Sequence, residues 1–196
     1  MRHRMPFVIL ALGLLFASLP LVAGAETRQA NGPVSELPPL LTQSFAIFRT
    51  EPEELPPSMV KVLKPGIDSE LPPSGGHGLN LSLAQKAVPP GHARPLWLVP
   101  GRDWVMLLEQ PRRNQSSFGG SEGPIRVAIE RGLSFYSGVP RTKDPHLMRV
   151  MSLVPDGVVA VEVGKGIRAS VGHNVISRKV DQKKIWEHLR LIRGER

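Results

Sequence analysis

From residue 147 to 163 the sequence runs LMRVMSLVPDGVVAVEV, two apolar runs joined by a Pro-Asp-Gly corner. Pro155 fixes the φ that the first corner of a type I turn needs, and Gly157 can take a positive φ without steric cost. Apolar residues recur at every second position on both sides of the corner, as in half-buried strands. We therefore expect two antiparallel strands joined here, continued through turns at 164–166 and 172–174 to residue 180.

The composition predicts a single globular domain. The chain has 196 residues, of which 41% are hydrophobic and 21% charged, as in an ordinary soluble domain. Gly and Pro are numerous, at 19 and 20, which favours short elements and many turns over long helices. We expect an α+β fold over residues 40–180, a small and mostly antiparallel β-sheet domain with two short helices packed on it.

The two helices are predicted at residues 40–49 and 124–131. In the first, Leu41, Phe45 and Phe48 share one face, and in the second Pro124 suits the first helical position. Residues 96–99 and 104–108 are apolar on successive positions around a Pro-Gly-Arg-Asp turn, which indicates a hairpin. Because strands that are apolar on both faces are covered on both faces, this hairpin is expected at the middle of the domain.

The intervening segments are rich in turn residues. Residues 65–90 predict mainly loop, with one short strand where leucines alternate over 79–83. Residues 112–123 predict a polar Gly/Ser loop. The acidic residues at 51–54 stand in a proline-bounded connection, so we interpret them as a solvated charge cluster and not as a catalytic carboxylate pair.

The N-terminus has the pattern of a secretory signal peptide. Two arginines precede an uncharged apolar run at 7–22, and small residues follow at 23–25. We expect cleavage after Ala25, a flexible linker over 26–39 and a secreted or extracytoplasmic protein. The alternative is an uncleaved segment that tethers the protein to the membrane, since the apolar run approaches the length that spans a bilayer.

The charge favours anionic partners. The formal net charge is +8 at neutral pH, and the pI is about 10.4. Outside the cytosol such a surface would meet acidic envelope polymers, anionic lipid head groups or extracellular nucleic acid, although the basic residues are also spread as on any soluble surface. No specific nucleic-acid interaction is predicted. The chain has no cysteine, so neither a disulfide framework nor a cysteine-linked lipid is available to it.

Residues 181–196 predict a basic amphipathic helix. Asp181 can cap it, and Ile185, Leu189 and Ile192 fall on one face. One interpretation is a terminal helix docked on the sheet through these apolar residues. The other is an interfacial helix that holds an anionic surface. Its contact residues would be Lys183, Lys184, Trp186, Arg190 and Arg193.

Four short motifs carry a resemblance. They are FAIFR at 45–49, WLVPG at 97–101, LVPDGV at 153–158 and HNVI at 173–176. Together with the signal peptide they make the chain similar to a group of uncharacterised exported proteins of actinobacteria, over residues 40–180. The resemblance implies a shared fold, because the motifs consist of turn and core residues, and it implies no catalytic residue.

One motif points to catalysis. GGSEG at 119–123 matches the G-x-S-x-G nucleophile elbow, and chain order offers Asp144 or Asp156, then His173, as partners for Ser121. The alternative is a Gly/Ser loop that matches a permissive pattern, since polar residues and not a buried strand precede it. The histidines show no metal-binding spacing, so neither a metal nor another cofactor is predicted. We expect a secreted, non-enzymatic binding or structural module of the bacterial envelope or exterior, with a small serine hydrolase using Ser121 as the alternative.

Overall fold

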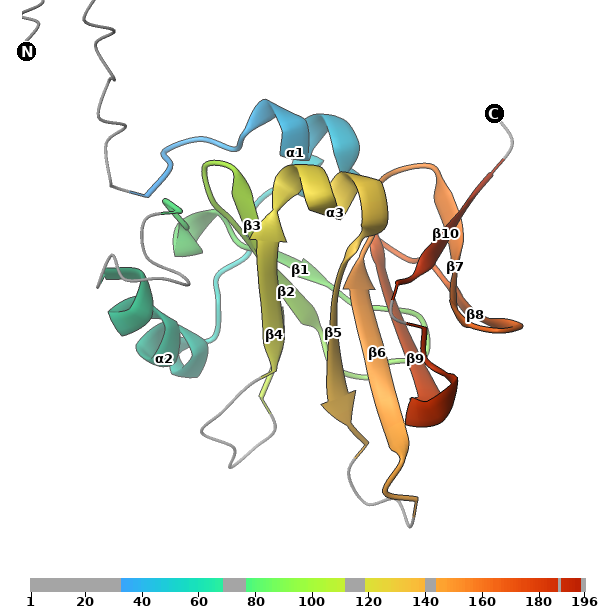
Figure 1. Cartoon of the computed structure of the whole chain (residues 1–196). Coiled ribbons are helices and arrows are strands. Elements are labelled where there is room, and N and C mark those ends of the chain that lie inside the picture. Colours follow the sequence, from blue (N-terminus) through green and yellow to red (C-terminus); the bar gives the residue numbers. More distant parts are fainter. Residues whose placement is uncertain (1–32, 69–76, 112–118, 140–143, 187, 195–196) are drawn as a thin grey trace, which may run out of the picture.

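The computed structural model describes residues 33–68, 77–111, 119–139, 144–186 and 188–194 (Figure 1). Within them the strands form three antiparallel sheets. The first sheet has the order β1 (Gln85–Ala87), β2 (Leu96–Pro100), β3 (Trp104–Glu109) and β4 (Gly120–Pro124). The second has the order β5 (Leu133–Gly138), β6 (Leu147–Leu153) and β9 (Val175–Asp181). The third has the order β10 (Arg190–Arg193), β7 (Val158–Gly164) and β8 (Ile167–Ser170).

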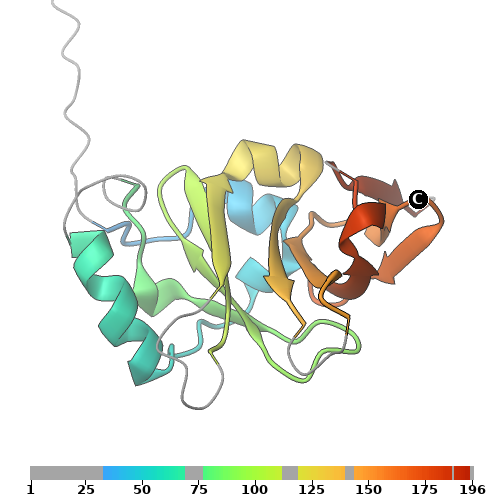
Figure 2. The same ribbon diagram turned by 60° about the horizontal axis from the view of Figure 1, so that its bottom comes forward.

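The helices lie around these sheets (Figures 1 and 2). The α-helices are α1 (Pro39–Ser44), α2 (Pro57–Asp68) and α3 (Ile125–Arg131). The 3₁₀ turns are η1 (Ala46–Arg49), η2 (Leu81–Leu83) and η3 (Gln182–Lys184). Helices α1 and α3 lie at one end of the strands, α2 flanks the first sheet, and the third sheet projects on the opposite side. The prediction of a β-rich, mostly antiparallel α+β fold is confirmed.

The β2–β3 hairpin lies between two cores, so both of its faces are covered, as its sequence predicted. Leu96 and Leu98 face the first core, which lies below α1 and α3, whereas Trp97 and Val99 face the second core under α2. Every residue of β2 is buried. Because alternate side chains point to opposite faces of a strand, an unbroken apolar run is what a strand between two cores requires.

The strands on either side of the Pro-Asp-Gly corner belong to different sheets, so the expectation that the corner joins them as a pair is wrong. Strand β6 pairs with β5 and β9, and β7 pairs with β8 and β10. The backbone N–H of Val154 donates to the carbonyl of Asn174 at 2.7 Å, which continues the β6–β9 ladder up to the corner. Gly157 has a φ of 78°, so the predicted positive φ is confirmed.

The segment at 40–49 is helical in two pieces, not one. Phe45 is extended, with φ −137° and ψ 112°, between α1 and η1. The N–H groups of Ala46 and Ile47 donate to Asp156 Oδ1 at 2.8 Å and to Asn174 Oδ1 at 2.9 Å. These side chains replace the helical carbonyls as acceptors, which is why the predicted helix breaks.

The tail is not the predicted basic helix. Asp181 caps only the short turn η3, where its Oδ1 accepts from the N–H of Lys183 at 3.0 Å. Beyond it Leu191 lies opposite Val161 as β10 pairs with β7, so the domain continues past residue 180 to Arg193. The edge of β7 offers the tail backbone hydrogen bonds at alternate residues, and an isolated helix of this length is marginal in water.

Three other segments differ from expectation. Helix α2 occupies part of the predicted loop and includes Pro65; Leu55 ahead of it, with Met59 and Leu63 in it, packs into the second core. Leu81–Leu83 forms η2 and not a strand, because Asn80 Oδ1 accepts from the N–H of Ser82. Gly120 starts β4 inside the predicted Gly/Ser loop.

The signal peptide at 1–25 and the linker up to residue 32 lie outside the described residues. The rest of the predicted linker belongs to the domain. The N–H of Val34 donates to the carbonyl of Gly78 at 2.9 Å, and Leu37 packs against the first core.

Candidate functional site

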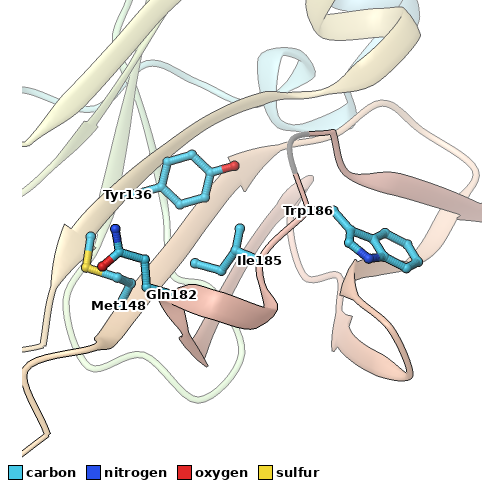
Figure 3. A pocket seen from close by; sticks show the side chains of 5 residues that line it. All are labelled: Tyr136, Met148, Gln182, Ile185 and Trp186. Carbon is cyan, nitrogen blue, oxygen red and sulfur yellow. The ribbon is translucent and has the colours of Figure 1, made fainter.

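Two adjacent hollows lie beside η3. The first, here called the apolar hollow, has a volume of about 550 Å³ and is lined by Tyr136, Met148, Gln182, Ile185 and Trp186. In Figure 3 the side chains of Tyr136, Met148, Gln182 and Ile185 gather on one side of the tail, and the indole of Trp186 points away from them. Tyr136 is 42% exposed although its ring is apolar. Burial raises the pKa of its phenol, so the ring is neutral at physiological pH.

The second hollow, here called the lysine hollow, has a volume of about 470 Å³. Its lining residues are Lys165, Ile167, Lys183, Lys184, Ile185 and Trp186. Ile185 and Trp186 therefore form a wall common to both hollows. One side of this wall is mainly apolar, and the other carries three positive charges.

The tail is held in place by backbone contacts. The N–H of Ile185 donates to the carbonyl of Gln182 at 3.3 Å, and that of Trp186 donates to the carbonyl of Val163 in β7 at 3.1 Å. A Cβ on Gly164 would lie 2.0 Å from the carbonyl oxygen of Lys184, so only glycine allows the tail to approach β7 this closely. Ile185 packs against the third core, which lies between the second and third sheets.

The carboxylates around the lysine hollow have other partners. Glu162 Oε1 accepts from the N–H of Gly166 at 3.0 Å, and its Oε2 lies 3.7 Å from Arg190 Nη1. Asp181 accepts from the backbone of Lys183. Among the described residues, no ion pair joins the ammonium groups of the three lysines to a carboxylate. Their charge is available to an external anion.

The structure gathers three of the five residues that the sequence predicted as an anionic contact. Lys183, Lys184 and Trp186 line the lysine hollow. Arg190 and Arg193 lie on β10, outside the lining of both hollows. The sequence missed the residues that other strands contribute. These are Tyr136 from β5, Met148 from β6, Lys165 from the β7–β8 turn and Ile167 from β8.

The serine-hydrolase candidates lie on separate elements. Ser121 is inside β4 opposite Leu107, and α3 begins only at Ile125, so the serine is not at the sharp strand-to-helix turn of a nucleophile elbow. Asp156 binds Ala46, Asn174 and Arg49. In the part of the chain that the structure describes, Ser121 forms no hydrogen bond with His173 or Asp156.

Asp144 and His173 complete the set that the sequence singled out for catalysis. Asp144 Oδ1 accepts from the N–H of His146 at 2.9 Å. His173 occupies the turn before β9 with a φ of 49°. The described residues thus place the candidates on different loops and strands and show no nucleophile–base contact.

A buried polar cluster links the first and second sheets. His92 Nε2 lies 3.2 Å from Glu109 Oε1, and Arg94 also pairs with this carboxylate. Arg149 Nη1 donates to His92 Nδ1 at 2.8 Å and to the Ser177 hydroxyl at 3.2 Å. Since an arginine is always a donor, Nδ1 accepts and Nε2 carries the hydrogen. Both nitrogens of His92 are thereby used within the fold.

Two further observations concern the described residues alone. They contain no group of three or more His, Cys, Asp or Glu side chains that could hold a metal ion. None of their helices is long and apolar enough to cross a membrane.

Comparison with known proteins gives no counterpart: no protein-family model matches the chain, and neither a curated protein nor a solved structure matches it. The functional argument therefore depends on the site itself. The resemblance to exported actinobacterial proteins remains an expectation from the sequence.

Proposed function

We propose that this protein is an exported, non-enzymatic binding module that holds an anionic lipid surface of the bacterial envelope through the lysine hollow. The observation that carries the proposal is the placement of Lys165, Lys183 and Lys184 around a hollow walled by Ile185 and Trp186. Export is supported by the N-terminal sequence pattern, with two arginines, an apolar run and small residues at 23–25.

The mixture of charge and apolar surface favours a lipid over an acidic polymer. Basic residues near an anionic membrane contribute about 1 kcal/mol each, and an indole is stable at head-group depth, where one end is wet and the other apolar. A polymer of acidic groups would use the lysines and leave Trp186 and Ile185 without a role.

Co-sedimentation of the full chain with vesicles tests this. Wild type should bind vesicles that contain phosphatidylglycerol and not vesicles of phosphatidylcholine alone. Lys183→Ala with Lys184→Ala should lower the partition coefficient about 30-fold, because two contributions of about 1 kcal/mol are lost. Binding should weaken as added salt shortens the Debye length.

The matched control removes two lysines elsewhere. Lys61 and Lys64 are exposed on α2, so Lys61→Ala with Lys64→Ala changes the net charge equally at a distant place. Equal loss in both double variants would mean that total charge and not this site attracts the vesicle. If instead the site variant lost affinity for soluble polyglutamate and kept its vesicle binding, the partner would be an acidic polymer and the lipid assignment would be wrong.

A further inference from the structure

We propose that the two hollows form one binding site for a single-chain anionic lipid, with the hydrocarbon chain in the apolar hollow and the head group in the lysine hollow. The inference rests on the proposed function, since both use Lys183 and Lys184. It adds a discrete ligand with a defined position, whereas contact with a lipid surface requires only exposed charge and an interfacial aromatic residue.

The adjacency of the two hollows is the first argument. Ile185 and Trp186 line both, so a molecule that extends past this wall meets apolar side chains at one end and ammonium groups at the other. The volumes, about 550 and 470 Å³, lie in the range of small-molecule sites. An amphiphile has the same division between an apolar part and a charged part.

The lining of the apolar hollow suits a chain. Tyr136 presents a neutral ring, Met148 a flexible thioether that adapts to different shapes, and Ile185 a branched alkyl group. Among the described residues that line the apolar hollow, Gln182 is the only one with an amide side chain. Covering this surface with hydrocarbon removes apolar area from water at both partners, which is the main driving force for such binding.

The lysine hollow selects the head group by charge. Lysine is a compact point charge with three rotatable donors and binds phosphate or carboxylate oxygens without a fixed geometry. Lys165 reaches the hollow from the β7–β8 turn and Lys183 and Lys184 from η3, so the cations lie on two elements. Because Glu162 is occupied by Gly166 and Arg190, an incoming anion does not have to displace it from the lysines.

The experiment uses the full chain and dodecyl phosphate below its micelle-forming concentration, with calorimetry as the readout. We expect one molecule per chain. Dodecyl maltoside, which has the same chain and a neutral head, and inorganic phosphate, which has no chain, should each bind at least tenfold more weakly. Equal binding of the neutral detergent or of inorganic phosphate would overturn the two-part site.

Substitutions test which end of the ligand lies in which hollow. Lys183→Ala with Lys184→Ala should weaken the binding of dodecyl phosphate about tenfold and leave the binding of dodecyl maltoside unchanged. Tyr136→Asp should weaken both amphiphiles about tenfold, because it places a carboxylate in the apolar hollow. Val62→Asp, at a residue that is 50% exposed on α2, is the control for an added surface charge and should change neither. If Tyr136→Asp bound like Val62→Asp, the chain would not occupy the apolar hollow.

Folding is checked by thermal melts, and Gln182→Glu is the second variant if Tyr136→Asp unfolds. Gln182 is exposed on η3, and glutamate has nearly the same shape, so a loss of affinity there reports charge in the hollow. Retained affinity in Gln182→Glu would contradict the site. The inference can fail alone: vesicle binding through Lys183 and Lys184 without selective binding of dodecyl phosphate would leave the proposed function in place. If vesicle binding did not depend on Lys183 and Lys184, both the proposed function and this inference would be wrong.

Discussion

Asn174 Nδ2 donates a hydrogen bond to Asp156 Oδ1 at 2.8 Å, joining the turn before β9 to the corner between β6 and β7. Ala46 and Ile47 donate to the same two side chains, and Arg49 Nη2 lies 2.9 Å from Asp156 Oδ2. Three sequence motifs that are far apart in the chain therefore meet at one place. Their polar groups bind one another, so the residues of these motifs have a structural role: they hold distant segments of the fold together.

Replacing Asn174 should destabilise the protein strongly. It is 7% exposed with a φ of 62°, and Asn174→Ala leaves the Ile47 N–H and the Val154 carbonyl without this partner. We expect a loss of about 3 kcal/mol in the free energy of unfolding, measured in urea, because each buried polar group left alone costs about 1–3 kcal/mol. His173→Ala, at the exposed neighbour that also has a positive φ, should cost less than about 1 kcal/mol. Similar losses in both variants would contradict this role of Asn174.

The Glu109 cluster should make stability depend on acid pH. Burial alone would raise the pKa of the Glu109 carboxyl, but the hydrogen bond from His92 and the charges of Arg94 and Arg149 hold it below its usual value. A lowered folded-state pKa contributes stability above the unfolded value of about 4.3, and this contribution is lost as the pH falls through the folded pKa.

Urea unfolding at several pH values between 7 and 3 measures this contribution. Glu109→Gln should cost about 3 kcal/mol at pH 7, since it removes the buried carboxylate that pairs with Arg94 and binds His92, and its stability should fall less steeply with acid than that of wild type. Glu53→Gln is the control, because that carboxylate is half exposed in its pair with Lys86. An unchanged pH dependence in Glu109→Gln would show that the cluster does not hold this carboxyl in its charged form.

Gly157 should be intolerant of a side chain for reasons of backbone conformation alone. Its φ is 78°, yet no atom beyond the two adjacent residues lies within 4 Å of the place where a Cβ would stand. Gly157→Ala should therefore cost about 1 kcal/mol and Gly157→Val about 1–3 kcal/mol. Gly138→Ala, where there is equal space and no positive φ, should change the stability by less than about 0.5 kcal/mol. If Gly157→Ala and Gly138→Ala had the same melting temperature, this explanation would be wrong.

A catalytic Ser121 would react with a fluorophosphonate probe. We expect no labelling that depends on Ser121, because it lies within β4 and forms no hydrogen bond with His173 or Asp156 among the described residues. Labelling of wild type that is lost in Ser121→Ala would establish the hydrolase and displace the binding module as the function.

Local patterns were sufficient to predict some of the strands, but not β4, which starts in a predicted loop, or β10, which lies in a predicted helix. The unbroken apolar runs of β2 and β3 and the positive φ of Gly157 each depend on neighbouring residues, and each is confirmed. Which strands share a sheet depends on distant residues. The corner at 154–157 shows where the chain turns, but the pairing of β6 with β9 is fixed by contacts such as that of Val154 with Asn174.

The tail and the site illustrate the same limit. Ile185, Leu189 and Ile192 have helical spacing, but the edge of β7 competes with a short helix and the chain pairs there instead. Lys183, Lys184 and Trp186 could be proposed from sequence because they are neighbours in the chain. Lys165, Tyr136 and Met148 come from other elements, so only the topology places them beside the tail.

The position of Trp186 at a lipid surface tests the account most directly. Tryptophan emission is measured for the full chain and for Trp186→Phe with vesicles whose chains carry bromine, a short-range quencher. We predict quenching in phosphatidylglycerol vesicles that is much weaker in Trp186→Phe, absent in neutral vesicles and reversed by salt. Equal quenching of wild type and Trp186→Phe, or quenching that is the same in neutral vesicles, would contradict binding through the lysine hollow.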